Sequence, residues 1–335
     1  MVEIVKLGFA PLVDCAIPVV AAEKGFAAAE GIDLVVERAP SWAALRDRLA
    51  FGRVDGAHIL APLALAIHQG IAGVPATALR VPVSLGLGNN AVTVSLDLYE
   101  RMVLVAPEVM AGPPALRARA LRPIIDADRA AGKPLLSFVT VFHFSCHHYE
   151  LLKWLADGGV DGRSEVNIGV IAPPRMVESL AAGWIDGYCA GEPWNQRAVQ
   201  RGIGKVVVTK ADIRPDGLEK VLGLRADWAE EHPAQVAALI RAVVKAADWS
   251  CDPANRAELA RLLAEAQYVG LAADLIELTL QGAIPAPDRN RPDRADALRL
   301  LSEMAAAGQL DLSDADRIRL ANAVWRPDLY QEAMG

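Results

Sequence analysis

One pattern occurs twice in this chain, and it strongly restricts the possible fold. Residues 32–59 and 166–190 each contain a β-branched run, an Ala-Pro pair, a helical run and the ending L-A-x-G-x-x-D-G. A strand, a helix and a second strand make a βαβ unit, whose two strands lie parallel in one sheet. Because each half of the chain carries one copy, the sequence predicts two similar α/β lobes.

The length and the order of the segments suggest where these lobes divide. A chain of 335 residues exceeds one minimal core. A polar helical stretch beginning near residue 106 reads as a crossing, and the sequence after residue 210 reads as mostly helix. We therefore expect lobe 1 to contain residues 1–105 and 212–335, including C-terminal helices, and lobe 2 to contain residues 106–211. Ligands of open α/β sheets bind beyond the carboxyl ends of strands, so we expect the ligand cleft between the lobes.

Composition excludes several classes of protein. Hydrophobic residues make up 53% and charged residues 22%, which is typical of a folded globular protein. The net charge is −7, and Lys and Arg form no concentrated stripe, which argues against direct nucleic-acid binding. No apolar run reaches the roughly 18–20 residues of a membrane span.

The N-terminus and the cysteines favour a cytoplasmic location. A strand-like run from Ile4 to Phe9 follows the first residues directly, without a charged, apolar and cleavable leader before it. The cysteines are widely spaced and form no CxxC motif, which predicts free thiols in a reducing compartment. They are Cys15, Cys146, Cys189 and Cys251.

The stretch HFSCHH, residues 143–148, has four possible interpretations. A zinc site would use its histidines and cysteine, although His147 and His148 would point about 100° apart on a helix. A Cys/His pair would form a nucleophile. If Ser145 caps the helix instead, the free N–H groups and the helix dipole favour an anion beside one histidine. The fourth interpretation is capping and packing without any ligand.

Other candidate binding residues each have a structural alternative. Trp42 begins a predicted helix that Ser41 can cap, and its indole can donate one hydrogen bond or simply pack in the core. Asn90 can bind a ligand through its amide or simply form a turn. Gly191 allows close approach of the backbone to a ligand. Lys220 can reach the cleft or lie on the surface.

Several stretches together resemble the nitrate/nitrite- and bicarbonate-binding proteins of ABC transporters. The resemblance covers nearly the whole chain and implies a type II periplasmic-binding fold with two hinged α/β lobes that close on a small oxyanion. It implies a binding protein without catalytic residues, cofactor or metal. The stretches include LGFAPLVDCAIPVVAAEKGFAAAEGIDLVVE, SWAALRDRLAFGRVDGAHILAP, HHYELLKWLA, GEPWNQRAV and LEKVLGLRADWAEEHP.

The same resemblance implies an anion pocket. Its residues would be Trp42, Asn90, His147, Gly191 and Lys220. Nitrate binders commonly have Gln where this chain has Asn90, so the choice among nitrate, nitrite and another oxyanion stays open.

Three functions agree with this resemblance. The chain is similar to cytoplasmic nitrate/nitrite sensors that pair with an RNA-binding transcription antiterminator, and this is the function we expect because no leader is visible. In such a sensor, anion-induced lobe closure releases the antiterminator. The first alternative is the substrate-binding component of a nitrate- or bicarbonate-type ABC transporter. The second is an enzyme like thiamin-pyrimidine synthase, although FSCHH does not reproduce its Cys-rich motif.

Overall fold

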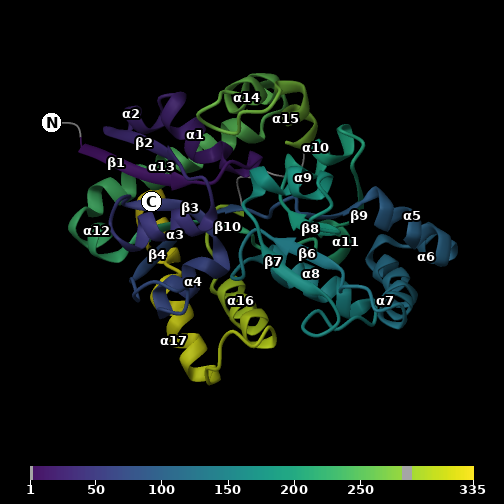
Figure 1. Ribbon diagram of the computed structural model, residues 1–335. Coiled ribbons are helices and arrows are strands. Elements are labelled where there is room, and N and C mark those ends of the chain that lie inside the picture. The colour runs from purple at the N-terminus through teal and green to yellow at the C-terminus, as the bar shows by residue number, and fades with distance from the viewer. Residues whose placement is uncertain (1–2, 281–288) are drawn as a thin grey trace. The chain divides into compact units, whose positions relative to one another are not determined.

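The chain folds into two compact units, each built on its own sheet (Figure 1). The computed structural model describes residues 3–280 and 289–335. Unit 1 contains Met1–Gly88, Phe144–Cys146 and Gly217–Gly335, and unit 2 contains Asn89–His143 and His147–Asp216. The α/β fold predicted from the repeat is confirmed.

The sheet of unit 1 has the strand order β2-β1-β3-β10-β4. Strand β1 is parallel to β2 and β3, whereas β10 is antiparallel to β3 and β4. The sheet is therefore mixed, with one reversed strand among four that share a direction. The strands are β1 Glu3–Phe9, β2 Ile32–Arg38, β3 Gly56–Leu60, β4 Leu79–Gly86 and β10 Lys220–Arg225.

The sheet of unit 2 has the equivalent order, β7-β6-β8-β5-β9. Strand β6 is parallel to β7 and β8, and the reversed strand β5 is antiparallel to β8 and β9. Each unit thus follows one plan, as the repeat predicts. The strands are β5 Ala91–Ser95, β6 Ser137–Thr140, β7 Asn167–Val170, β8 Gly187–Ala190 and β9 Gly204–Thr209.

The repeated sequence forms β2–α3–β3 in unit 1 and β7–α9–β8 in unit 2, and its aspartates make equivalent bonds. Asp55 Oδ2 accepts a hydrogen bond from the backbone N–H of Lys6 at 2.8 Å. Asp186 Oδ2 accepts one from the backbone N–H of Ser137 at 2.7 Å. Each aspartate therefore fastens the turn before its strand to the neighbouring parallel strand, at Lys6 of β1 or at Ser137, the first residue of β6. The shared motif has a structural function in both units.

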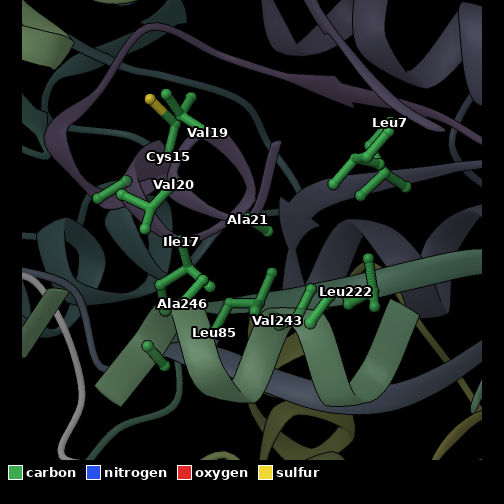
Figure 2. Close-up of a cluster of buried hydrophobic side chains, with 14 of the residues drawn as sticks. Leu7, Cys15, Ile17, Val19, Val20, Ala21, Leu85, Leu222, Val243 and Ala246 are labelled. Carbon is green, nitrogen blue, oxygen red and sulfur yellow. The ribbon is translucent and has the colours of Figure 1, made fainter. Parts of the chain in front are cut away.

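The helices of unit 1 cover its sheet and bury one large hydrophobic cluster. Helix α13 comes late in the chain but packs against the early helix α1 (Figure 1). Figure 2 shows Ile17 and Val20 of α1 in the same cluster as Val243 and Ala246 of α13. The helices are η1 Val13–Cys15, α1 Ala16–Glu23, α2 Phe26–Ala29, α3 Trp42–Ala50, α4 Ala61–Gln69, α12 Ala226–Glu231, α13 Pro233–Cys251, η3 Pro253–Asn255, α14 Arg256–Leu263, α15 Ala273–Thr279, α16 Arg294–Ala306, α17 Asp314–Val324 and α18 Pro327–Met334.

Unit 2 has a separate core, in which Phe138 of β6 and Trp154 of α8 are buried. Helix α8 begins at Cys146, so its first residue belongs to unit 1 and the rest to unit 2. The other helices complete the cover of the second sheet. The helices are α5 Leu96–Val105, α6 Pro107–Ala111, η2 Pro114–Ala120, α7 Leu121–Ala130, α8 Cys146–Asp157, α9 Pro173–Ala181, α10 Trp194–Gln200 and α11 Lys210–Ile213.

The units divide earlier than the expected lobes, which were 1–105 with 212–335 and 106–211. Unit 1 first ends at Gly88, because strand β5 (Ala91–Ser95) pairs with β8 and β9 of the second sheet. The polar helical stretch that we read as a crossing lies wholly inside unit 2. Residues 1–2 and 281–288 of the expected lobe 1 lie outside the described residues.

The region after residue 210 is mostly helical, as predicted, but near its start it contains a strand that the helical reading missed. Strand β10 runs from Lys220 to Arg225 between β3 and β4. Its residues Lys220–Leu224 are all buried, and the strand has sheet partners on both sides. A continuous buried run of this kind has neither strand nor helix periodicity, so the pattern alone did not reveal it.

Across the described residues, no helix is both long enough and apolar enough to cross a bilayer.

Candidate functional site

Four buried side chains of unit 1 form a cluster that we call the Lys220 cluster: Asp14, Trp42, His58 and Lys220. Lys220 Nζ lies 2.8 Å from Asp14 Oδ2 and 5.5 Å from the centroid of the Trp42 ring. His58 Nε2 lies 3.7 Å from Asp14 Oδ1, and its ring centroid is 6.5 Å from that of Trp42. The structure thus brings together Trp42 and Lys220, two of the predicted site residues.

The fold gathers this cluster at the edge of the first sheet where its parallel strands end. Asp14 lies in η1, shortly after β1, and Trp42 begins α3, shortly after β2. Lys220 begins the reversed strand β10 and pairs with Leu60, the last residue of β3. This is the edge at which ligands of open α/β sheets bind.

Trp42 is held firmly at the start of its helix. Ser41 Oγ accepts a hydrogen bond from the backbone N–H of Ala44 at 3.1 Å, so the predicted N-cap is confirmed. The indole is fully buried, and its Nε1 finds no hydrogen-bond acceptor among the described residues. A buried donor without an acceptor is costly, which makes this N–H a strong candidate for ligand binding.

Lys220 remains charged although it is fully buried. Desolvation lowers the pKa of its ammonium group, but the carboxylates of Asp14 and Glu219 outweigh that effect and raise the pKa above its ordinary value. Glu219 Oε1 lies 3.2 Å from Lys220 Nζ. Lys220 is therefore a buried ammonium group that lies beside two carboxylates, those of Asp14 and Glu219.

The other predicted site residues, Asn90, His147 and Gly191, lie in unit 2. Asn90 directly precedes β5 and Gly191 directly follows β8, and because Ala91 pairs with Ala190, they share one edge of the second sheet. His147 is fully buried in the first turn of α8, the helix that follows β6. Unit 2 thus collects its candidates at the edge equivalent to that of the Lys220 cluster.

Two buried ionic residues accompany Asn90. Its Nδ2 donates to Glu150 Oε2 at 3.0 Å, and Lys210 Nζ lies 3.7 Å from Glu150 Oε1. The backbone N–H of Lys210 also donates to the carbonyl of Asn90 at 2.8 Å. The bond to Glu150 orients the side-chain amide of Asn90.

The His/Cys stretch is divided between the two units. His143 and His148 are in edge-to-face contact in unit 2, with ring centroids 5.8 Å apart. Burial and the nearby His143 lower the pKa of His148 to about 4. The Cys146 thiol donates to the carbonyl of Leu218 at 3.2 Å within unit 1. Within the ranges 3–280 and 289–335, no group of three or more His, Cys, Asp and Glu residues is arranged to hold a metal ion.

The sequence interpretation missed Asp14, His58, Glu150 and Lys210. One signal was available for Asp14, which is the single charged residue within the apolar stretch PLVDCAIPVV, whereas Glu150 lies in HHYELLKWLA beside two histidines and a lysine. A charged residue on an otherwise apolar face is rarely buried unless it is paired. No comparable local signal marks His58 or Lys210.

Comparisons with a family model and with individual protein sequences show which proteins this chain is similar to. A model of the NMT1-like family matches residues 2–264. The nitrate/nitrite binding protein NrtA of Synechococcus elongatus is 34% identical over 308 residues, which cover 90% of this chain and 67% of that protein. The nitrate import ATP-binding protein NrtC of Synechocystis is 33% identical over 345 residues. These cover 98% of this chain but 49% of NrtC, so the chain spans about half the length of that relative.

The fold agrees with the sequence relationship. The crystal structure of the periplasmic nitrate-binding protein NrtA from Synechocystis superimposes with a TM-score of 0.87 at 26% identity, covering 98% of this chain and 88% of that one. The predicted periplasmic-binding-protein-like fold is therefore confirmed. These relatives are named as binding and transport proteins, which agrees with the prediction that the chain is not an enzyme.

Proposed function

Because the chain belongs to the NMT1-like family and is similar to NrtA over most of its length, we propose that it binds nitrate or nitrite as the substrate-binding part of an ABC-type importer. The observation that carries this proposal is the Lys220 cluster, in which Lys220 Nζ lies 5.5 Å from the centroid of the Trp42 ring and the buried Nε1–H of that ring finds no acceptor among the described residues.

The chemistry of the candidate residues suits a small, singly charged and weakly basic anion. Such an anion is held best by several modest donors, since one strong cation would also hold stronger bases. Trp42 offers an indole N–H and Lys220 an ammonium group that Asp14 already partly neutralises. Each hydrogen bond to a charged partner contributes about 1.5–3 kcal/mol before desolvation costs.

The candidate site residues of unit 2, considered by themselves, offer donors of the same kind. They are the side-chain amide of Asn90, the imidazole of His147 and the backbone at Gly191. Because Glu150 holds the Asn90 amide in one orientation, the donor is ordered before the anion arrives. Preorganised donors improve affinity because less conformational freedom is lost on binding.

Calorimetric titration of the purified protein with nitrate, nitrite and bicarbonate tests the proposal. Trp42→Phe keeps an aromatic ring but removes the N–H, so the Kd for the preferred anion is expected to rise about tenfold or more. His147→Ala is expected to weaken binding to at least the same extent.

A matched control is available in unit 2. Trp154 is also fully buried, and its Nε1 likewise finds no acceptor in the described part of the chain, but it lies in the core of unit 2. Trp154→Phe is therefore expected to leave the Kd unchanged. Undiminished affinity in both Trp42→Phe and His147→Ala would remove the assignment of the site.

The second candidate function is the cytoplasmic sensor that controls an RNA-binding antiterminator. The observation that favours it is that none of the four cysteines is paired in a disulfide, and three of them are buried, as expected in a reducing compartment. A sensor is expected to bind the antiterminator in a pull-down assay and to release it when nitrate is added. An importer component is expected to form no such complex, and its deletion should abolish high-affinity nitrate uptake instead.

A further inference from the structure

His58 belongs to the Lys220 cluster, yet the proposed anion site does not use it. Its side chain lies on β3 and is fully buried. Neither ring nitrogen makes a hydrogen bond to any described residue. A buried imidazole in this state carries a donor and an acceptor that the folded protein does not satisfy.

Asp14 links His58 to Lys220. Its Oδ2 lies 2.8 Å from Lys220 Nζ, whereas its Oδ1 receives no hydrogen bond from the described residues and lies 3.7 Å from His58 Nε2. The carboxylate is 2% exposed, so water does not compensate the free oxygen well. One carboxylate therefore faces the ammonium group on one side and a neutral imidazole on the other.

The charged groups that face His58 are few. They are Asp14 from η1, together with Lys220 and the adjacent Glu219 at the start of β10. The elements packed against β3 contribute no others, because their ionisable side chains are exposed or bonded elsewhere. These side chains are Glu3 and Lys6 on β1, Arg46, Asp47 and Arg48 on α3, His68 on α4 and Arg225 on β10.

We propose that His58 takes up one proton from solvent when an anion binds at Lys220, and that Asp14 couples the two events. This inference rests on the proposed anion-binding function. When Lys220 donates hydrogen bonds to the anion, its hold on Asp14 weakens. A protonated His58 then donates a hydrogen bond from Nε2 to Asp14 Oδ1. Its positive charge replaces the weakened interaction of that carboxylate with Lys220.

The protonation state of the free protein agrees with this coupling. Burial lowers the pKa of His58 to about 4, despite the opposing effect of Asp14. His58 is therefore neutral at pH 7 before the anion arrives and can accept a proton. Since the bound state holds more protons than the free state, anion affinity increases as the pH falls, by up to about tenfold per pH unit for uptake of one full proton.

Calorimetry in buffers with different ionisation enthalpies measures the proton directly. Nitrate and nitrite are titrated at pH 7 in Bis-Tris, imidazole and Tris, whose cationic forms do not compete with an anion. The dependence of the observed enthalpy on the buffer gives the number of protons taken up. We expect net uptake of close to one proton by the unmodified protein and none by His58→Gln with anion still bound.

His68→Gln is the control, because His68 is a partly buried histidine of the same unit outside the cluster. It is expected to retain the uptake of the unmodified protein. If His58→Gln does not fold, Asp14→Asn is the second test and is expected to lose the uptake as well.

The outcomes separate this inference from the proposed function. Anion binding without proton uptake, or uptake that persists in His58→Gln, would overturn the coupling and leave the anion site intact. If the unmodified protein binds neither anion, the proposed function fails and the coupling fails with it.

Discussion

Replacement of Lys220 by methionine is expected to lower the free energy of unfolding by about 3–5 kcal/mol, because it leaves the Asp14 carboxylate buried without its cation. The side chains of Lys220 and Asp14 are 0% and 2% exposed. Methionine fills a volume similar to that of lysine. The loss of stability therefore reflects the missing positive charge more than a cavity. Urea unfolding followed by circular dichroism measures the effect.

Two further variants test whether the loss of stability comes from the buried charge. Lys153→Met removes an exposed lysine from an i,i+4 pair with Asp157 on α8, and it is expected to change stability by about 0–1 kcal/mol. Adding Asp14→Asn to Lys220→Met removes one of the two buried carboxylates that pair with Lys220, the other being Glu219, and is expected to recover part of the loss. Equal stability of the Lys220 and Lys153 variants would show that the buried pair does not stabilise the fold.

The second large effect is expected at the glycine that ends the repeated motif. A Cβ on Gly187 would lie 2.8 Å from the Phe138 ring and 3.0 Å from the carbonyl oxygen of Thr93. The neighbouring strand β5 and the core side chain leave no space, so Gly187→Ala is expected to cost about 1–3 kcal/mol. Its equivalent, Gly56→Ala, is expected to behave alike, since its Cβ would lie 2.9 Å from the carbonyl oxygen of Gly223.

Gly169 on β7 provides the matched strand control. A Cβ there would meet only Val139, at 3.6 Å, and its φ is not positive. Gly169→Ala is therefore expected to change the free energy of unfolding by less than about 0.5 kcal/mol. Thermal and urea unfolding of the three variants provide the comparison. A Gly187 variant as stable as the Gly169 variant would contradict the packing explanation of the motif.

The repeat made the architecture predictable because its information is local. Each copy specifies a strand, a helix, a turn and an aspartate that bonds to the adjacent strand, all within about 30 residues. The reversed strands β5 and β10 were harder to assign because their partners lie far away in the sequence. Strand β5 pairs with β8 about 100 residues later, and neither its composition nor its neighbours indicate which sheet it joins.

The candidate site was partly predictable for a related reason. Trp42 and Lys220 were identified through family resemblance, and the structure brings them together. Their buried partners Asp14 and His58 come from other elements of unit 1, and only the folded sheet edge brings these elements near each other. Which side chains come close together depends on the order of the strands in the sheet. Patterns in a single sequence do not specify that order.

The position of β10 also has a consequence for synthesis on the ribosome. This strand lies between β3 and β4, yet it follows all of unit 2 in the chain. The nascent polypeptide therefore has every strand of the second sheet before the first sheet can be completed. Domains generally fold in order from the N-terminus during translation. Here the first sheet lacks the strand between β3 and β4 until residue 225 has left the exit tunnel.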